Sequence, residues 1–87
     1  MSELRIHHLK FSRDTMTVAF ADGRTIEVAL DNFPCLHNGR PAQREQWRLI
    51  GRGLGVHWEE LDEDLSVENI LAAYSRGKAG AYVHVAP

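Results

Sequence analysis

Hydrophobic and polar residues alternate on either side of the dipeptide Asp22-Gly23, and this pattern predicts a β-hairpin. The hydrophobic positions are Met16, Val18 and Phe20 before the turn and Ile26, Val28 and Leu30 after it. A two-residue turn would place the hydrophobic residues of one strand opposite polar residues of the other. A three-residue loop over residues 21–23 pairs the two hydrophobic sets and puts Gly23 where a left-handed backbone is required. We therefore expect the three-residue loop.

Further strands are expected before and after this hairpin. Residues 4–11 read as a strand whose hydrophobic positions fall on both faces, so it is either covered on both sides or interrupted by a β-bulge. Residues 54–58 read as a short strand. Its entry, Gly51-x-Gly53-x-Gly55, has the wrong spacing and context for a dinucleotide-binding fingerprint and indicates a tight connection instead. Both a last short strand and a loose tail fit residues 79–87.

A first helix is expected over the segment that follows the Asn38-Gly39 loop. Pro41 suits the first helical position, and Gly51 suits the residue after a helix end. The helix is therefore predicted to run from Ala42 to Ile50, with its hydrophobic contacts made by Ala42, Trp47 and Ile50.

A second helix has clearer boundary signals. Ser66 is a good N-cap, and Leu65 and Ile70 occupy the two positions of a hydrophobic staple around it. Gly77 is a plausible residue to end this helix. Together the elements predict an α+β fold, in which an antiparallel sheet of three to five strands, including the hairpin around Asp22-Gly23, is packed by two short helices.

Length and composition narrow the class of protein. Eighty-seven residues allow one domain, residues 1–87, with a thin core, and a homodimer would be one way to bury more surface. The single cysteine, Cys35, excludes an internal disulfide framework and a four-cysteine zinc site. A net charge of −2 argues against a general nucleic-acid binder. With no membrane span and no signal-peptide hydrophobic region, we expect a cytoplasmic protein.

The charges are unevenly distributed, with +3 over residues 40–52 and −6 over residues 59–68. Arginines recur every fourth residue through the first predicted helix, which would align them on one side of it. With the neighbouring tryptophan they form a candidate interaction surface: Arg40, Arg44, Trp47, Arg48 and Arg52. This surface could bind an acidic partner or phosphates, or pair with the acidic block within the fold or across a dimer.

A second candidate, a polar site, lies next to and within the acidic block and consists of His57, Trp58, Asp62, Glu63 and Asp64. His57 could act as a general base if a carboxylate orients it, although no nucleophile is visibly placed for it. The carboxylates suit a hard cation, but the spacing of an EF-hand is missing. They are also typical of the residues that precede a helix, where the helix dipole favours negative charge. We assign no catalytic residue, metal ligand or cofactor.

Several segments resemble a bacterial family known only as domain of unknown function 2442. The segments are residues 16–24, 26–30, 33–36, 44–51 and 55–67, and the most specific of them contains H-W-x-x-L-D-E-D-L-S at residues 57–66. The resemblance covers residues 4–73. It implies a small α+β domain with an antiparallel sheet and no established activity, so it transfers no site residue. Some members continue into a helix-turn-helix domain, and we do not expect this chain to bind DNA by that route. Relatives are encoded beside another small family, an arrangement that suggests toxin–antitoxin pairs.

Three hypotheses for function follow. The favoured one is a non-enzymatic interaction or regulatory module, antitoxin-like, that binds another small protein. The second is a small metal-dependent or histidine-assisted hydrolase that uses His57 with Asp62 or Asp64. The third is a nucleic-acid-associated regulatory dimer that contacts phosphates through the arginines, although direct nucleic-acid binding is not expected from the net charge.

Overall fold

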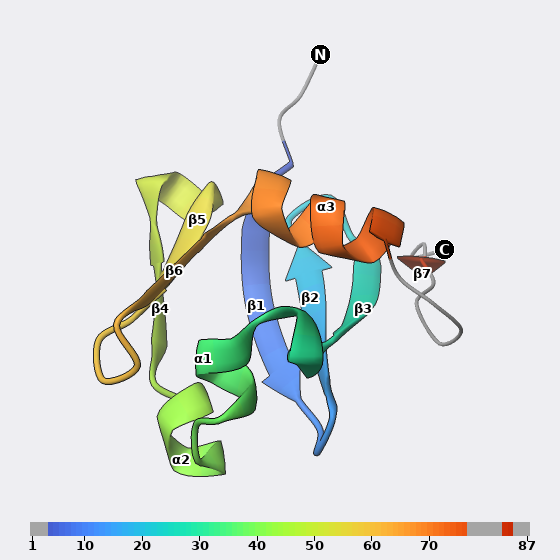
Figure 1. The fold of residues 1–87 in the computed structure, drawn as a ribbon. Helices are drawn as coiled ribbons and strands as arrows, with labels where there is room; N and C mark the ends of the chain where they lie inside the picture. Colours follow the sequence, from blue (N-terminus) through green and yellow to red (C-terminus); the bar gives the residue numbers. More distant parts are fainter. Residues whose placement is uncertain (1–3, 77–82, 85–87) are drawn as a thin grey trace.

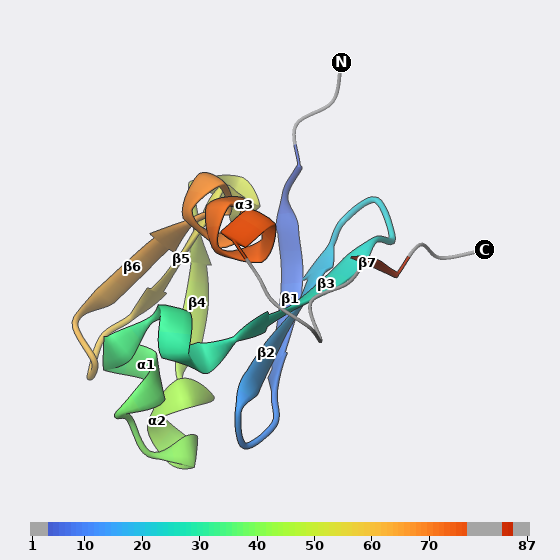
Figure 2. The same ribbon diagram turned by 45° about the vertical axis from the view of Figure 1, so that its right-hand side comes forward.

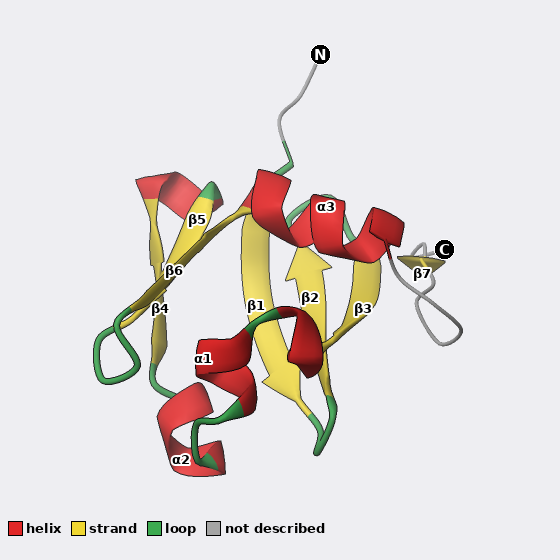
Figure 3. Cartoon of the chain, in the orientation of Figure 1, coloured by secondary structure: helices red, strands yellow, loops and turns green. Residues whose placement is uncertain are grey.

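The computed structural model describes residues 4–76 and 83–84, and within them the strands form two antiparallel sheets (Figure 1). The larger sheet has the order β1-β2-β3-β7, with bounds Ile6–Phe11, Thr15–Phe20, Thr25–Ala29 and Val83–His84. The smaller sheet has the order β4-β5-β6, with bounds Trp47–Ile50, Gly55–Trp58 and Glu63–Ser66. The helices are α1 (Pro34–His37), α2 (Pro41–Arg44) and α3 (Val67–Arg76), with 3₁₀ turns at Leu30–Asn32 and Gly51–Gly53. Figure 3 separates these helices and strands by colour.

The predicted α+β class and antiparallel pairing are confirmed, and the division of the strands between two sheets was not predicted. Residues 79–82 and 85–87 lie outside the described part of the chain. Val83 and His84 pair with β3 as a short strand.

The hairpin of β2 and β3 has the predicted three-residue loop. Val18 lies opposite Ile26 and Met16 lies opposite Val28. The Phe20 amide donates to the Arg24 carbonyl at 2.8 Å, closing the loop. Gly23 has φ +98°, a left-handed conformation that glycine adopts without steric cost.

Strand β1 contains the β-bulge that was one of the two predicted alternatives. Ile6 pairs with Phe20 but His8 pairs with Ala19, so the register shifts between Ile6 and His8. The extra residue reverses the alternation along the strand. Ile6 and Leu9 are therefore both buried on the core side, although three positions separate them.

The predicted first helix over Ala42–Ile50 is wrong. Helix α2 ends at Arg44, and Trp47–Ile50 form strand β4, which pairs with β5. Trp47 and Leu49 are half-buried while Arg48 and Ile50 are exposed, which is the period-2 pattern of a strand. Tertiary pairing with β5 outweighs the helix-compatible spacing in this segment.

The N-terminus of α3 has the predicted cap. The Asn69 amide donates to Ser66 Oγ at 3.0 Å, and the Ser66 amide donates to Asn69 Oδ1 at 3.0 Å. Leu65 and Ile70 are buried on either side of the cap. The acidic residues before the cap were expected to cluster at the helix start. They instead form a turn and strand β6. Gly77 lies outside the described residues.

The hydrophobic core lies between the two sheets and beneath α3, which packs against β3 and β6 (Figure 2). Its largest fully buried side chains include Trp58, Leu9, Met16, Leu30, Leu36 and Ile70. At Gly53 the 3₁₀ turn passes close to β1, where an added Cβ would lie 2.6 Å from the Ile6 carbonyl oxygen. This close approach holds the connection between β4 and β5 of the smaller sheet beside β1 of the larger one. Among the described helices, none has the length and apolar character needed to cross a membrane.

Candidate functional site

The smaller sheet has one face turned to the core and one turned to solvent. Val56, Trp58 and Leu65 are buried on the core side. By alternation the opposite side carries the residues that we call the outer face: Arg48, Ile50, Gly55, His57, Asp64 and Ser66. Ile50 is 41% exposed, so a hydrophobic side chain lies at the surface beside charged ones.

A row of three side chains crosses the outer face from one strand to the next. Arg48 on β4 lies opposite His57 on β5, and His57 lies opposite Asp64 on β6. Directly opposite residues of an antiparallel pair have neighbouring side chains. The row therefore places a cation, an imidazole and a carboxylate next to one another.

The His57 ring contacts two carboxylates. Its Nδ1 lies 2.5 Å from Asp64 Oδ1, and its Nε2 lies 3.1 Å from Glu59 Oε1. Glu59 Oε1 also lies 3.6 Å from Arg48 Nη2. The His57 side chain is 19% exposed, whereas those of Arg48 and Asp64 are 70% and 69% exposed. The imidazole is thus sheltered in the middle of the row and the charges at its two ends are open to solvent.

The two carboxylates raise the pKa of His57 above its ordinary value. The largest cause is the hydrogen bond with Asp64, followed by that with Glu59, and partial desolvation opposes both. The imidazolium is the form in which both ring nitrogens donate, so it satisfies both carboxylates at once. The site therefore favours a protonated His57.

This arrangement predicts a pH dependence of stability. Because the pKa of His57 is raised in the folded state, its stabilising contribution is fully present below the unfolded pKa of about 6.5 and is lost as the pH rises through the folded pKa. We expect the Tm of the wild-type protein to fall between about pH 6 and about pH 9 by more than the Tm of His57→Gln. Thermal unfolding followed by circular dichroism across this range measures the difference.

A control variant isolates the exposed partner. Asp64→Asn removes the carboxylate on β6 but leaves Glu59, so its pH dependence should lie between those of the wild type and His57→Gln. Identical curves for the wild type and His57→Gln would contradict a raised pKa.

The predicted arginine stripe does not form, because its members lie on different elements. Arg40 precedes α2, Arg44 is buried, Arg48 is on β4, and Arg52 lies in the 3₁₀ turn with φ +58°. Trp47 is half-buried, with its ring 5.3 Å from that of His8. The nucleic-acid hypothesis requires a continuous surface that contacts phosphates, and this surface depended on the arginine stripe. Of the predicted interaction surface, only Arg48 lies on the outer face.

Two of the five predicted polar-site residues come together, and the other three lie in separate places. His57 and Asp64 meet, as described above. Trp58 points into the core, where its Nε1 donates to the Arg44 carbonyl at 2.9 Å. Asp62 is in the turn with φ +50°, and Glu63 lies one position from Asp64 and so on the other side of β6.

Sequence reasoning missed Glu59, the second partner of His57. The signal was present, because residues two apart in an extended segment project from the same side. His57 and Glu59 have this spacing. The contribution of Arg48 required the β4–β5 register, which the predicted helix concealed.

The outer face has a carboxylate-bound histidine but no nucleophile next to it. Both ring nitrogens of His57 are taken up by carboxylates, and the Ser66 hydroxyl accepts the Asn69 amide at the cap of α3. Within residues 4–76 and 83–84, no group of three histidine, cysteine, aspartate or glutamate side chains is arranged to hold a metal ion. The arrangement is suited to charge recognition.

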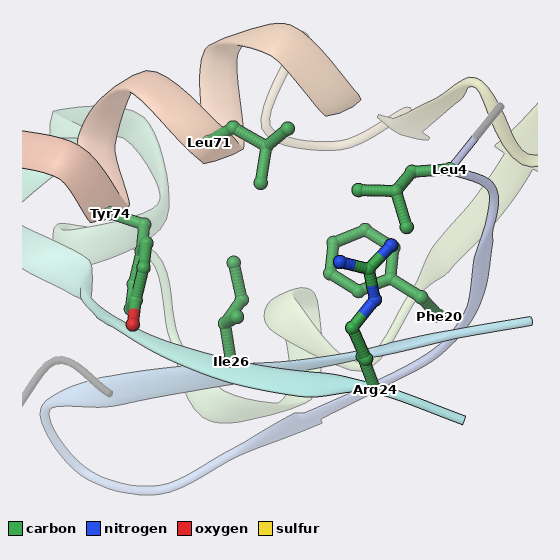
Figure 4. Close-up of a pocket in the computed structure, with 6 residues that line it drawn as sticks. All are labelled: Leu4, Phe20, Arg24, Ile26, Leu71 and Tyr74. Carbon is green, nitrogen blue, oxygen red and sulfur yellow. The ribbon is translucent and has the colours of Figure 1, made fainter. Parts of the chain in front are cut away.

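A small groove lies elsewhere, between α3 and the β2–β3 hairpin (Figure 4). It has a volume of about 70 Å³ and is lined by Leu4, Phe20, Arg24, Ile26, Leu71 and Tyr74. Known ligand pockets are about 300–1,000 Å³. Its one charged group, the Arg24 guanidinium, is paired with Asp22 at 2.8 Å, and this contact lowers the pKa of Asp22. The groove can take a single apolar side chain and offers it no specific polar partner.

Comparison with known proteins identifies relatives that are themselves uncharacterised. A crystal structure of a protein of unknown function from Rhodospirillum rubrum ATCC 11170 is similar, with a TM-score of 0.71 and 27% sequence identity over 82% of this chain and 88% of that chain. No curated protein matches. The family described as "Protein of unknown function (DUF2442)" matches residues 6–75, which include both sheets except β7. This chain therefore belongs to the DUF2442 family.

Proposed function

We propose that this chain is a non-enzymatic binding module that docks a second small protein on its outer face. The observation that carries the proposal is the row Arg48–His57–Asp64, whose two ends carry opposite charges and are about two-thirds exposed. Opposite charges held at fixed positions on a sheet give a partner an orientation as well as an attraction. An antitoxin that binds its toxin is one form that such a module takes.

The hydrophobic end of the outer face supports the same proposal. Ile50 lies across Gly55, where an added Cβ would be 3.2 Å from Ile50 Cγ1. Leu54, in the turn before β5, is the other large hydrophobic residue that is exposed within the described residues. An exposed isoleucine on a surface that also carries fixed charges is a suitable anchor for a protein contact.

The chemistry of the face specifies its partner. The complementary surface would present a carboxylate to Arg48, a basic side chain to Asp64 and an apolar side chain to Ile50. A carboxylate of the partner that paired with Arg48 would compete with Glu59. The 3.6 Å between Glu59 Oε1 and Arg48 Nη2 is long for an ion pair, so the Arg48 guanidinium is available to the partner.

The test is recovery of the tagged full-length chain from its own cells after nuclease treatment, with measurement of the mass and stoichiometry of the complex. We expect one small protein in equimolar amount. Arg48→Glu and Ile50→Asp should each raise the Kd of the purified complex by about tenfold or more, since loss of one good interface contact is worth about 1.4 kcal/mol.

Arg24→Glu is the matched control, because Arg24 is an exposed arginine in the β2–β3 turn, on the other sheet. It should leave the Kd unchanged. Recovery of the chain alone would overturn the proposal, as would a complex that is weakened equally by Arg24→Glu and Arg48→Glu.

A histidine-assisted hydrolase is the second candidate, favoured by one observation. The contact between Asp64 and His57 Nδ1 is the kind of contact by which a carboxylate orients a catalytic imidazole. Turnover of ester, amide or phosphate substrates that is abolished in a folded His57→Ala variant would favour this candidate. Turnover that survives in His57→Ala would exclude His57 as the catalytic base.

A further inference from the structure

A second and larger pocket is lined by none of the residues of the outer face. It has a volume of about 240 Å³ and lies between the β1–β2 turn and α2, both at the lower end of the molecule in Figure 1. Its lining residues are Phe11, Ser12, Arg13, Pro41, Arg44 and Glu45. The pocket is therefore lined by two arginines, Arg13 and Arg44, from distant parts of the sequence.

Arg44 is the one charged residue that is buried in the described part of the chain, with 8% of its surface exposed. Its Nε donates to the Leu36 carbonyl at 2.7 Å, and its Nη2 donates to the His37 carbonyl at 2.8 Å. A guanidinium has five N–H donors, so these two bonds leave further donors that can serve the pocket.

Within residues 4–76 and 83–84, no carboxylate forms an ion pair with Arg44. Among the described residues, the ion pairs of Arg24, Arg48 and His57 do not include Arg44. A buried charge that is balanced only by carbonyl dipoles is expensive to desolvate, and an anion brought to it gains a strong interaction. Because Arg44 lines the pocket, an anion bound there would lie next to it.

The remaining walls indicate what kind of anion would fit. Arg13 adds a second positive charge, which no described carboxylate pairs with. Phe11 and Pro41 supply apolar ring surface. Glu45 is the one acidic lining residue and makes an ion pair with neither arginine among the described residues, so it opposes an anion at the rim.

We propose that this pocket binds a small molecule carrying an oxyanion, either a carboxylate or a phosphate, on a compact apolar body. Arg44 and Arg13 hold the oxyanion, because the planar fork of a guanidinium matches two oxygens of either group. The apolar body lies against Phe11 and Pro41. The volume is slightly below the usual range for ligand pockets, which suits a small metabolite-sized ligand.

The experiment titrates the full-length ¹⁵N-labelled protein with benzoate and, separately, with inorganic phosphate, at an ionic strength held constant with chloride. We expect saturable chemical-shift changes at the amides of Phe11, Ser12 and Arg13 and at Arg44 Nε. Arg13→Gln should raise the Kd by about tenfold, the effect of losing one charge-assisted contact. Glu45→Gln should lower the Kd, because it removes the opposing charge.

The variants and probes separate the outcomes. Arg24→Gln, which removes an exposed arginine outside the pocket, should leave the Kd unchanged. Saturation with benzoate alone assigns a carboxylate ligand, with phosphate alone a phosphate ligand, and with both an oxyanion in general. Linear, unsaturated shifts with both probes would overturn the proposal, as would equal Kd values for wild type, Arg13→Gln and Glu45→Gln. Arg13→Gln and Glu45→Gln change exposed side chains, so the folding of these two variants is not at risk.

Discussion

Trp58→Ala is expected to lower the free energy of unfolding by about 3–5 kcal/mol, the range for truncating a large aromatic residue in a core. Trp58 is fully buried, its ring packs edge-on against Phe11 at 6.5 Å, and its Nε1 donates to the Arg44 carbonyl. Domains of this size have about 4–13 kcal/mol of total stability, so the loss is comparable to the whole. Urea unfolding followed by circular dichroism measures it.

Trp47→Ala is the matched control for this prediction. Trp47 is the direct cross-strand partner of Trp58, but it is half-buried. The same truncation should therefore cost clearly less at Trp47. Equal urea midpoints for the two variants would contradict a larger contribution from the fully buried Trp58 than from the half-buried Trp47.

The features that could be predicted from the sequence are those encoded by neighbouring residues. The β2–β3 hairpin follows from alternation and from the one loop length that pairs its two hydrophobic sets. The start of α3 follows from Ser66 and the staple around it. In both cases the partners lie within a few residues of each other, so local rules suffice.

Strand β4 could not be predicted in the same way, because the partner that makes it a strand is β5. Four residues are too few for periodicity to distinguish a strand from a helix, and Pro41 and Gly51 both fit helix boundaries. The predicted helix also led to a second error, because the fourfold arginine spacing through it and its flanking residues was taken as one aligned stripe, and the structure separates these arginines. Strand β6 was missed for the same reason, since its pairing with β5 is tertiary.

The candidate site shows the consequence of this most clearly. Arg48 and His57 were assigned to two different surfaces, although they are direct partners across β4 and β5. His57 and Asp64 were correctly placed in one candidate group, but their contact depends on the β5–β6 register. The sequence could therefore suggest Arg48, His57 and Asp64 as separate candidates. Their alignment in one row follows only from the β4–β5 and β5–β6 pairings.

The second large effect is expected at Arg44, where Arg44→Leu should lower the free energy of unfolding by about 2–4 kcal/mol. Leucine fills much of the space of the buried stem but leaves the Leu36 and His37 carbonyls without their donors. These bonds tie the end of α1 to α2, so the cost falls on the packing between the two short helices. We expect a Tm lower by about 10 °C or more.

Arg48→Leu makes the same substitution at an exposed arginine and should change the stability by no more than about 0.5 kcal/mol. Arg44→Lys, which keeps the charge and one flexible donor, should recover part of the loss. Similar Tm values for Arg44→Leu and Arg48→Leu would contradict the structural role of Arg44. The contrast also decides how binding is tested: a charge reversal at Arg44 would report on folding, and only a reversal at Arg48 reports on the outer face.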